Sequence, residues 1–228
     1  MKNVVLSLIA VLVVCLSAGA ALADYTYTGS LSTDNARGGG INAVGEWRPI
    51  DLSWNVTGNP GAWHYAYRLD TTTRDVSHFL LETSPTFTSQ NISSFTGPIE
   101  IGTWTPQDGN SNLEMPANLY GIKFNWGGST HVTYEFDSNR APRWGDFYTK
   151  DGNDGPGHYA WNTGFGNPDS DPVGPPANGS LDYHLLVPDT VGPPDVNDVP
   201  EPGSLALGLC ALGVTLGGVI RRRRTAKR

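Results

Sequence analysis

Cysteine is almost absent from this 228-residue sequence, which has only Cys15 and Cys210, one near each end. Residues 24–199 therefore can form no internal disulfide and offer no thiol nucleophile or thiolate metal ligand. Basic residues are also scarce in this part, with 8 against 21 acidic residues, a net charge of −13. Because nucleic-acid binding needs a basic surface, we expect no nucleic-acid partner.

Recognisable catalytic motifs are missing as well. The sequence has no Gly-x-Ser-x-Gly motif and no Gly-rich phosphate loop. Its five histidines fall in no metal-binding spacing, so we expect no metal centre built on them; they are His64, His78, His131, His158 and His184. The sequence thus predicts a protein that is not an enzyme. A glycosidase is the alternative, because its carboxylate pair is defined by distance in space.

The N-terminus has the features of a secretory signal peptide. Lys2 gives a basic start, an apolar run covers Val4 to Leu16, and Ala21 and Ala23 form an Ala-x-Ala site before Asp24. This order predicts a signal peptide over residues 1–23 that is cleaved by signal peptidase, and therefore an exported protein.

The C-terminus is divided into three parts. Val199, Pro200, Glu201 and Pro202 precede a 16-residue apolar run from Leu205 to Ile220. A helix of this length spans roughly 24 Å, less than the roughly 30 Å of a bilayer core, so we expect a marginal transmembrane helix over residues 205–220. A basic cluster follows, which the positive-inside rule keeps in the cytoplasm; it consists of Arg221, Arg222, Arg223 and Arg224.

This arrangement over residues 199–228 resembles the PEP-CTERM sorting signal of exported bacterial proteins. The resemblance implies that exosortase recognises Pro200 to Pro202 and that the tail is then removed. The protein would lie in the inner membrane transiently and then at the cell surface or in the extracellular matrix. A plain C-terminal anchor is the alternative. Residues 137–152 and 161–165 also look like stretches of uncharacterised members of this group.

The part between the two ends has the periodicity of β-strands. Apolar and polar residues alternate in 52–56 and 65–69, which is typical of half-buried strands. Two further alternating runs, 120–126 and 131–137, are separated by Gly127-Gly128-Ser129 and predict a hairpin. We therefore expect an all-β domain over residues 24–187, an antiparallel, jelly-roll-like β-sandwich.

Residues 151–180 look irregular, and residues 188–198 form a Pro/Asp-rich linker. Two groups of residues in this region are candidate ligand sites. Oxygen-rich side chains beside glycines predict a possible Ca²⁺ loop, formed by Asp151, Asn153 and Asp154. Asp169 and Asp171 make a second, weaker pattern of this kind. Apart from Ca²⁺ we expect no cofactor.

The second group is aromatic. Flat rings beside acids and amides are typical of sugar-binding surfaces, and the candidate platform consists of Trp144, Tyr159, Trp161 and Phe165. The alternative is that these rings pin long loops to the sandwich. The sequence as a whole predicts a non-catalytic structural or adhesive protein within exopolysaccharide. A carbohydrate-binding module and a carbohydrate-active enzyme at the same location are the alternatives.

Overall fold

The computed structural model describes residues 24–45, 47–107, 112–152, 157–166 and 171–189. Within these residues it has thirteen strands and two short 3-10 helices, η1 (Asn35–Arg37) and η2 (Ser89–Asn91). Every ladder between the described strands is antiparallel, which confirms the prediction of an all-β antiparallel fold. The described residues contain no helix with the length and apolar character needed to cross a membrane. The predicted helix over residues 205–220 lies outside them.

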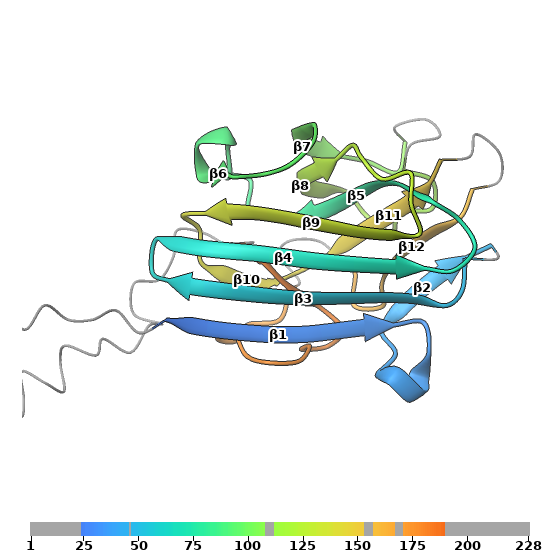
Figure 1. Cartoon of the computed structure of the whole chain (residues 1–228), viewed down its shortest axis with the longest axis horizontal. Helices are drawn as coiled ribbons and strands as arrows, with labels where there is room; N and C mark the ends of the chain where they lie inside the picture. The colour runs from blue at the N-terminus through green and yellow to red at the C-terminus, as the bar shows by residue number, and fades with distance from the viewer. Residues whose placement is uncertain (1–23, 46, 108–111, 153–156, 167–170, 190–228) are drawn as a thin grey trace, which may run out of the picture. The chain divides into compact units, whose positions relative to one another are not determined.

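One sheet has five strands in the order β1-β3-β4-β9-β6 and lies towards the viewer in Figure 1. Its strands are β1 (Tyr25–Ser32), β3 (Ile50–Asn59), β4 (Ala62–Thr71), β9 (His131–Ser138) and β6 (Ile92–Ser93). Side chains alternate between core and solvent along β3, β4 and β9. The alternation predicted for residues 52–56 and 65–69 is therefore confirmed.

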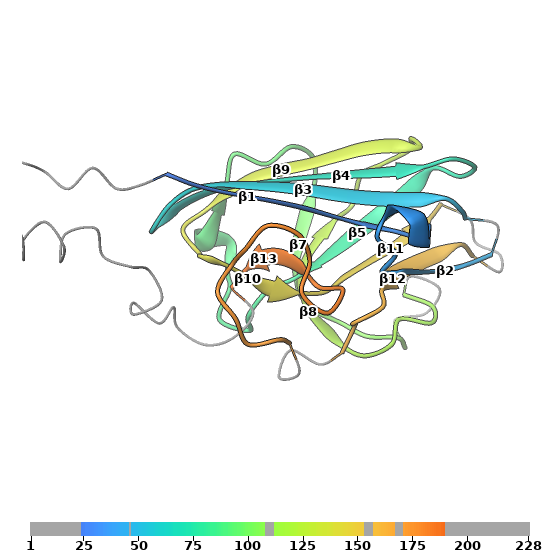
Figure 2. The ribbon, with the colours of Figure 1, turned by 90° about the horizontal axis from the view of Figure 1, so that it is seen from below.

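A six-stranded sheet has the order β2-β12-β11-β5-β8-β7, and β10 pairs with β13 in a separate two-stranded sheet. Figure 2 shows these strands on one side of the five-stranded sheet, so the domain has layers. The strands are β2 (Ile41–Val44), β12 (Tyr159–Asn162), β11 (Phe147–Asp151), β5 (Val76–Glu82), β8 (Leu119–Phe124), β7 (Ile99–Trp104), β10 (Pro142–Gly145) and β13 (Leu185–Pro188).

Aromatic side chains fill the space between the layers. Phe79 of β5 lies with its ring centroid 4.9 Å from that of Tyr134 of β9, and Tyr67 of β4 lies 6.1 Å from Phe79. All three side chains are fully buried. The hydroxyl of Tyr67 donates a hydrogen bond to the carbonyl oxygen of Leu186, at 2.8 Å. A shared core between facing sheets is consistent with a β-sandwich.

The hairpin predicted for residues 120–126 and 131–137 is wrong. β8 pairs with β5 and β7, whereas β9 pairs with β4 and β6 in the other sheet. The glycines between them carry the chain from one sheet to the other. Gly128 has a φ of 72°, and its N–H donates to the carbonyl oxygen of Val76 at 2.8 Å. At Gly127 a Cβ atom would collide with that same carbonyl group.

The stretch 151–180, expected to be irregular, contains the strand β12. β12 pairs with β11, and β11 pairs with β5. Because both ladders are antiparallel, the end of β12, the beginning of β11 and the end of β5 lie side by side. The last strand, β13, includes Pro188, which the sequence places in the linker. Asp189 follows and receives a hydrogen bond from Arg140 Nη1 at 2.7 Å. The ordered β domain thus continues through the end of β13.

Candidate metal centre

Four buried side chains that can bind a cation gather where β5 ends and β11 begins. Glu82 is 1% exposed, Asp146 0%, Asp171 8% and His184 4%. Burial of several carboxylates together is unfavourable unless a cation, a proton or hydrogen-bond donors compensate their charge. The contacts of each group therefore decide what this site can do.

Strand pairing brings two of these residues together. Phe147 of β11 lies opposite Leu81 of β5, so Glu82 and Asp146 are next to each other just beyond that pair. The N–H of Glu82 donates to the carbonyl oxygen of Asp146 at 2.9 Å, and the N–H of Asp146 donates to Glu82 Oε2 at 2.8 Å. The ladder fixes both carboxyl groups at the end of the six-stranded sheet.

Hydrogen bonds hold the Asp146 carboxylate in one orientation. Asn162 Nδ2, at the end of β12, donates to Asp146 Oδ1 at 2.6 Å, and the N–H of Gly166 donates to Oδ2 at 2.8 Å. Asn162 Oδ1 in turn accepts from the N–H of Phe147 at 3.0 Å. Asp146 Oδ1 has a second lone pair, which leaves it able to bind a cation.

His184 reaches the cluster from the other side, immediately before β13. Its two preceding residues, Asp182 and Tyr183, have φ values of 49° and 64°, a backbone region that is unfavourable for residues other than glycine. The turn closes when the N–H of His184 donates to the carbonyl oxygen of Leu181 at 2.9 Å. A Cβ atom on Gly164 would come within 2.7 Å of the imidazole, so glycine is needed there.

The His184 ring has one nitrogen hydrogen-bonded and one facing the carboxylates. Nδ1 lies 3.2 Å from the carbonyl oxygen of Leu181, which can only accept, so Nδ1 carries the hydrogen. Nε2 lies 3.4 Å from Asp146 Oδ1 and 3.6 Å from Asp171 Oδ1. These donor atoms of Asp146, Asp171 and His184 all lie within 4.8 Å of one another. They are the residues of the described chain best placed to hold a metal ion.

The electrostatics of the cluster reflect its burial. Burial, followed by the negative charges of Asp171 and Asp146, raises the pKa of Glu82 well above its usual range. Burial also raises the pKa of Asp146, although the hydrogen bonds from Asn162 and Gly166 and the nearby His184 oppose the shift. Both carboxyl groups thus hold a proton more tightly than in water when no other cation is present.

The residues predicted to form the Ca²⁺ loop are only partly described. Asp151 is 2% exposed, and its Oδ2 lies 2.8 Å from Nδ1 of His158. The backbone N–H of His158 donates to Asp151 Oδ1 at 3.3 Å. Asn153 and Asp154 lie outside the described residues, as does Asp169. Asp171, its neighbour in the second pattern, belongs to the cluster around Asp146. The Ca²⁺ loop stays a prediction.

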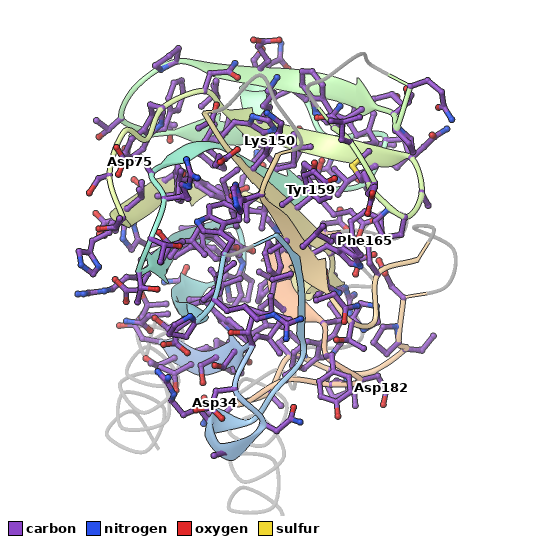
Figure 3. The ribbon with its side chains drawn as sticks, turned by 90° about the vertical axis from the view of Figure 1, so that its right-hand side faces the viewer. Asp34, Asp75, Lys150, Tyr159, Phe165 and Asp182 are labelled. Atoms are coloured by element: carbon purple, nitrogen blue, oxygen red, sulfur yellow. The ribbon has the colours of Figure 1, made fainter. Side chains whose placement is uncertain are left out.

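The four predicted platform rings divide between two hydrophobic clusters. Trp144 is 3% exposed and belongs to the main core, whereas Tyr159 is 6% exposed and belongs to a smaller cluster. Trp161 and Phe165 pack, half-buried, against that smaller cluster. Figure 3 shows Tyr159, Phe165 and Asp182 following one another along one side of the molecule. Trp161 and Phe165 are the two rings that keep an accessible face.

The sorting motif, the arginine cluster and the cleavage site before Asp24 lie outside the described residues, which begin at Asp24. Sequence reasoning did not single out Glu82 or Asp146, and it named His184 only among the histidines that it did not expect to bind a metal, because no fixed spacing links these residues. One local signal was present: Asp146 lies between Trp144 and Phe147, in a strongly aromatic run where a charged residue is unexpected.

Comparison with known proteins assigns no family to this chain. No family model matches it, and no curated protein matches it either. Among solved structures, the KRT10-binding region domain of the pneumococcal serine rich repeat protein PsrP is 13% identical, with 62% of this chain and 87% of that chain covered. The TM-score is 0.19, which is too low to support an argument about fold or function.

Proposed function

We propose that this chain is an exported, non-catalytic protein of the cell surface or exopolysaccharide matrix, with a structural or adhesive role. The observation that carries the proposal is the order of Pro200-Glu201-Pro202, the apolar run and the arginine cluster at the C-terminus. In this proposal the tail is a PEP-CTERM sorting signal that exosortase removes, and the body is a jelly-roll-like β-sandwich. A secreted domain of this size without disulfides must be held by its core, and the large aromatic core around Phe79 can fill that role.

Intact-mass analysis of the protein recovered after expression of the full chain in a bacterium with exosortase tests this proposal. We expect a species that begins at Asp24 and lacks the residues after the Pro-Glu-Pro motif. It should be found at the cell surface or in the matrix. Recovery of a chain that still carries residues 1–23, or one that keeps its terminal arginines in the cytosol, would contradict the proposal.

A groove at one end of the five-stranded sheet supports the second candidate function, in which the protein adheres by binding carbohydrate. Its volume is about 730 Å³, within the range of roughly 300–1,000 Å³ that is typical of small-ligand sites. The half-buried ring of Tyr25 and several hydrogen-bonding groups line it, a combination that suits sugars; the lining residues include Tyr25, His64, Asn91, Asp137 and Asn139.

Two His–Asp hydrogen-bonded pairs on the outer face of this sheet allow a controlled test. His64 Nδ1 lies 2.8 Å from Asp137 Oδ1 at the groove, and His131 Nδ1 lies 2.7 Å from Asp70 Oδ1 on the same two strands. We expect the exported protein to bind a subset of glycans on an array. Asp137→Ala should weaken that binding by roughly tenfold or more, since the glycan loses a hydrogen bond to the charged Asp137 carboxylate. Asp70→Ala should leave it unchanged; an equal loss in both variants, or no glycan binding by the unaltered protein, would argue against the groove.

A further inference from the structure

We propose that Asp146, Asp171 and His184 bind one Zn²⁺ ion, with the neighbouring carboxyl of Glu82 as the fourth ligand. This inference concerns the stability of the β domain and does not depend on the proposed function. The sequence predicts no metal centre on histidine, and the site emerges only when four distant segments are brought together.

The imidazole of His184 is prepared to bind a metal ion. Its Nδ1–H donates to the carbonyl oxygen of Leu181, so the lone pair of Nε2 faces the carboxylate oxygens. Metal-binding histidines nearly always make such a hydrogen bond through their other ring nitrogen, since it fixes the tautomer and the ring orientation. Nε2 is buried and accepts no hydrogen bond from any described residue. A lone pair directed at two acidic oxygens is an arrangement that a metal ion between them would stabilise.

The distances favour a metal ion over a direct hydrogen bond. His184 Nε2 lies 3.4 Å from Asp146 Oδ1 and 3.6 Å from Asp171 Oδ1. Both distances exceed the roughly 2.7–3.2 Å of a good N–H···O hydrogen bond. Two ligands of a tetrahedral Zn²⁺ ion, each about 2.0–2.1 Å from the metal, lie roughly 3.3–3.4 Å apart. The present spacing is close to that value.

The identity of the donors selects the metal. Ca²⁺ and Mg²⁺ prefer sites made of oxygen atoms alone, whereas imidazole suits zinc and its neighbours in the first transition row. The surroundings also resemble a zinc site, because Asn162 and the N–H of Gly166 orient the Asp146 carboxylate from behind. Glu82 supplies a further carboxyl group in contact with Asp171 and Asp146. All four side chains are at least nine-tenths buried, which fits a closed structural site.

An ion at this position would join the end of β5, the junction between β10 and β11, and the segment that leads into β13. Glu82 is the last residue of β5, and Asp146 lies between β10 and β11. His184 comes immediately before β13, and Asp171 lies in the segment before it. Asp182 and Tyr183, held in an unfavourable backbone conformation, come immediately before the histidine. The bond between His184 and the metal would stabilise this turn and hold β13 against β10.

The first test is the metal content of the protein that is purified after expression of the full chain. We expect one zinc ion per chain by elemental mass spectrometry, and much less than one in His184→Ala. His131→Ala is the matched control, because that imidazole is exposed and paired with Asp70 on the outer face of the sheet. It should keep the full zinc content. Zinc retained in His184→Ala, or absent from the unaltered protein even after incubation with Zn²⁺, would overturn the proposal.

A second measurement separates metal loss from misfolding of a variant. The unaltered protein is stripped with a chelator and its thermal unfolding is followed while Zn²⁺, Ca²⁺ or Mg²⁺ is added. We expect Zn²⁺ alone to raise the unfolding temperature, since an ion that binds only the folded state stabilises it. Asp171→Asn, which keeps the shape of the side chain, should weaken zinc binding at least tenfold. Restoration by Ca²⁺ or Mg²⁺, or no response to Zn²⁺, would refute a zinc site.

Discussion

Phe79→Ala is expected to lower the free energy of unfolding of the β domain by about 3–5 kcal/mol, the usual cost of removing a fully buried aromatic ring. Phe79 is 0% exposed and lies at the centre of the core. Its ring centroid is 4.9 Å from that of Tyr134 in the facing sheet and 5.7 Å from that of Phe147 in the neighbouring strand. Close-packed rings on both sides prevent the structure from collapsing into the cavity, which keeps the cost high.

Urea unfolding of the exported protein measures this change, and Phe95→Ala provides the matched control. Phe95 is 41% exposed, so the same substitution there should change the free energy of unfolding by no more than about 0.5 kcal/mol. If Phe79→Ala cost less than about 1 kcal/mol, the packing around this ring would be looser than the structure shows.

The part of the fold that sequence predicts well is the alternation within each strand. Leu52, Trp54 and Val56 all face the core, as do Tyr65 and Tyr67 in the adjacent strand. Because successive side chains on a strand point to opposite faces, a period of two is visible in the sequence without any knowledge of partners. Strand positions follow from this local rule, and so does the all-β class.

Pairing between strands is not a local property, and this is where the predicted hairpin fails. β8 and β9 both direct aromatic residues inward, and Phe124 and Tyr134 meet with centroids 5.1 Å apart. A hairpin would also place inward-facing rings side by side, so the periodicity is the same in both arrangements. The difference lies in Gly127 and Gly128, whose close approach to Val76 directs the chain across the core.

The candidate metal centre is invisible to sequence reasoning for the same reason. Asp146, Asp171 and His184 are separated by 25 and 13 positions, and no known ligand spacing covers them. One antiparallel ladder, between β10 and β13, brings two of these residues together: Gly145 pairs with Leu185, so Asp146 and His184 lie just beyond that pair. An aspartate in an aromatic run and a histidine before an apolar strand are weak signals separately, and only strand register relates them.

Glu201→Ala is expected to leave the C-terminal segment attached in almost the entire population, with the chain retained in the membrane fraction. Glu201 is the only acidic residue between Val199 and Arg228. It stands between Pro200 and Pro202 in the sequence, and prolines at these positions predict an extended segment outside any helix. The proposal has the membrane-embedded processing enzyme recognise this charge, and Glu201→Ala removes the charge while both prolines remain.

Asp198→Ala is the matched control, because it removes the same charge three positions upstream in the linker. Intact-mass analysis and membrane fractionation of the two variants, expressed with exosortase, compare them directly. We expect normal processing of Asp198→Ala, since a general loss of negative charge near the membrane would affect both variants alike. If Glu201→Ala were processed normally, Glu201 would not be the recognition element, and the signal for cleavage would lie elsewhere in the C-terminal segment.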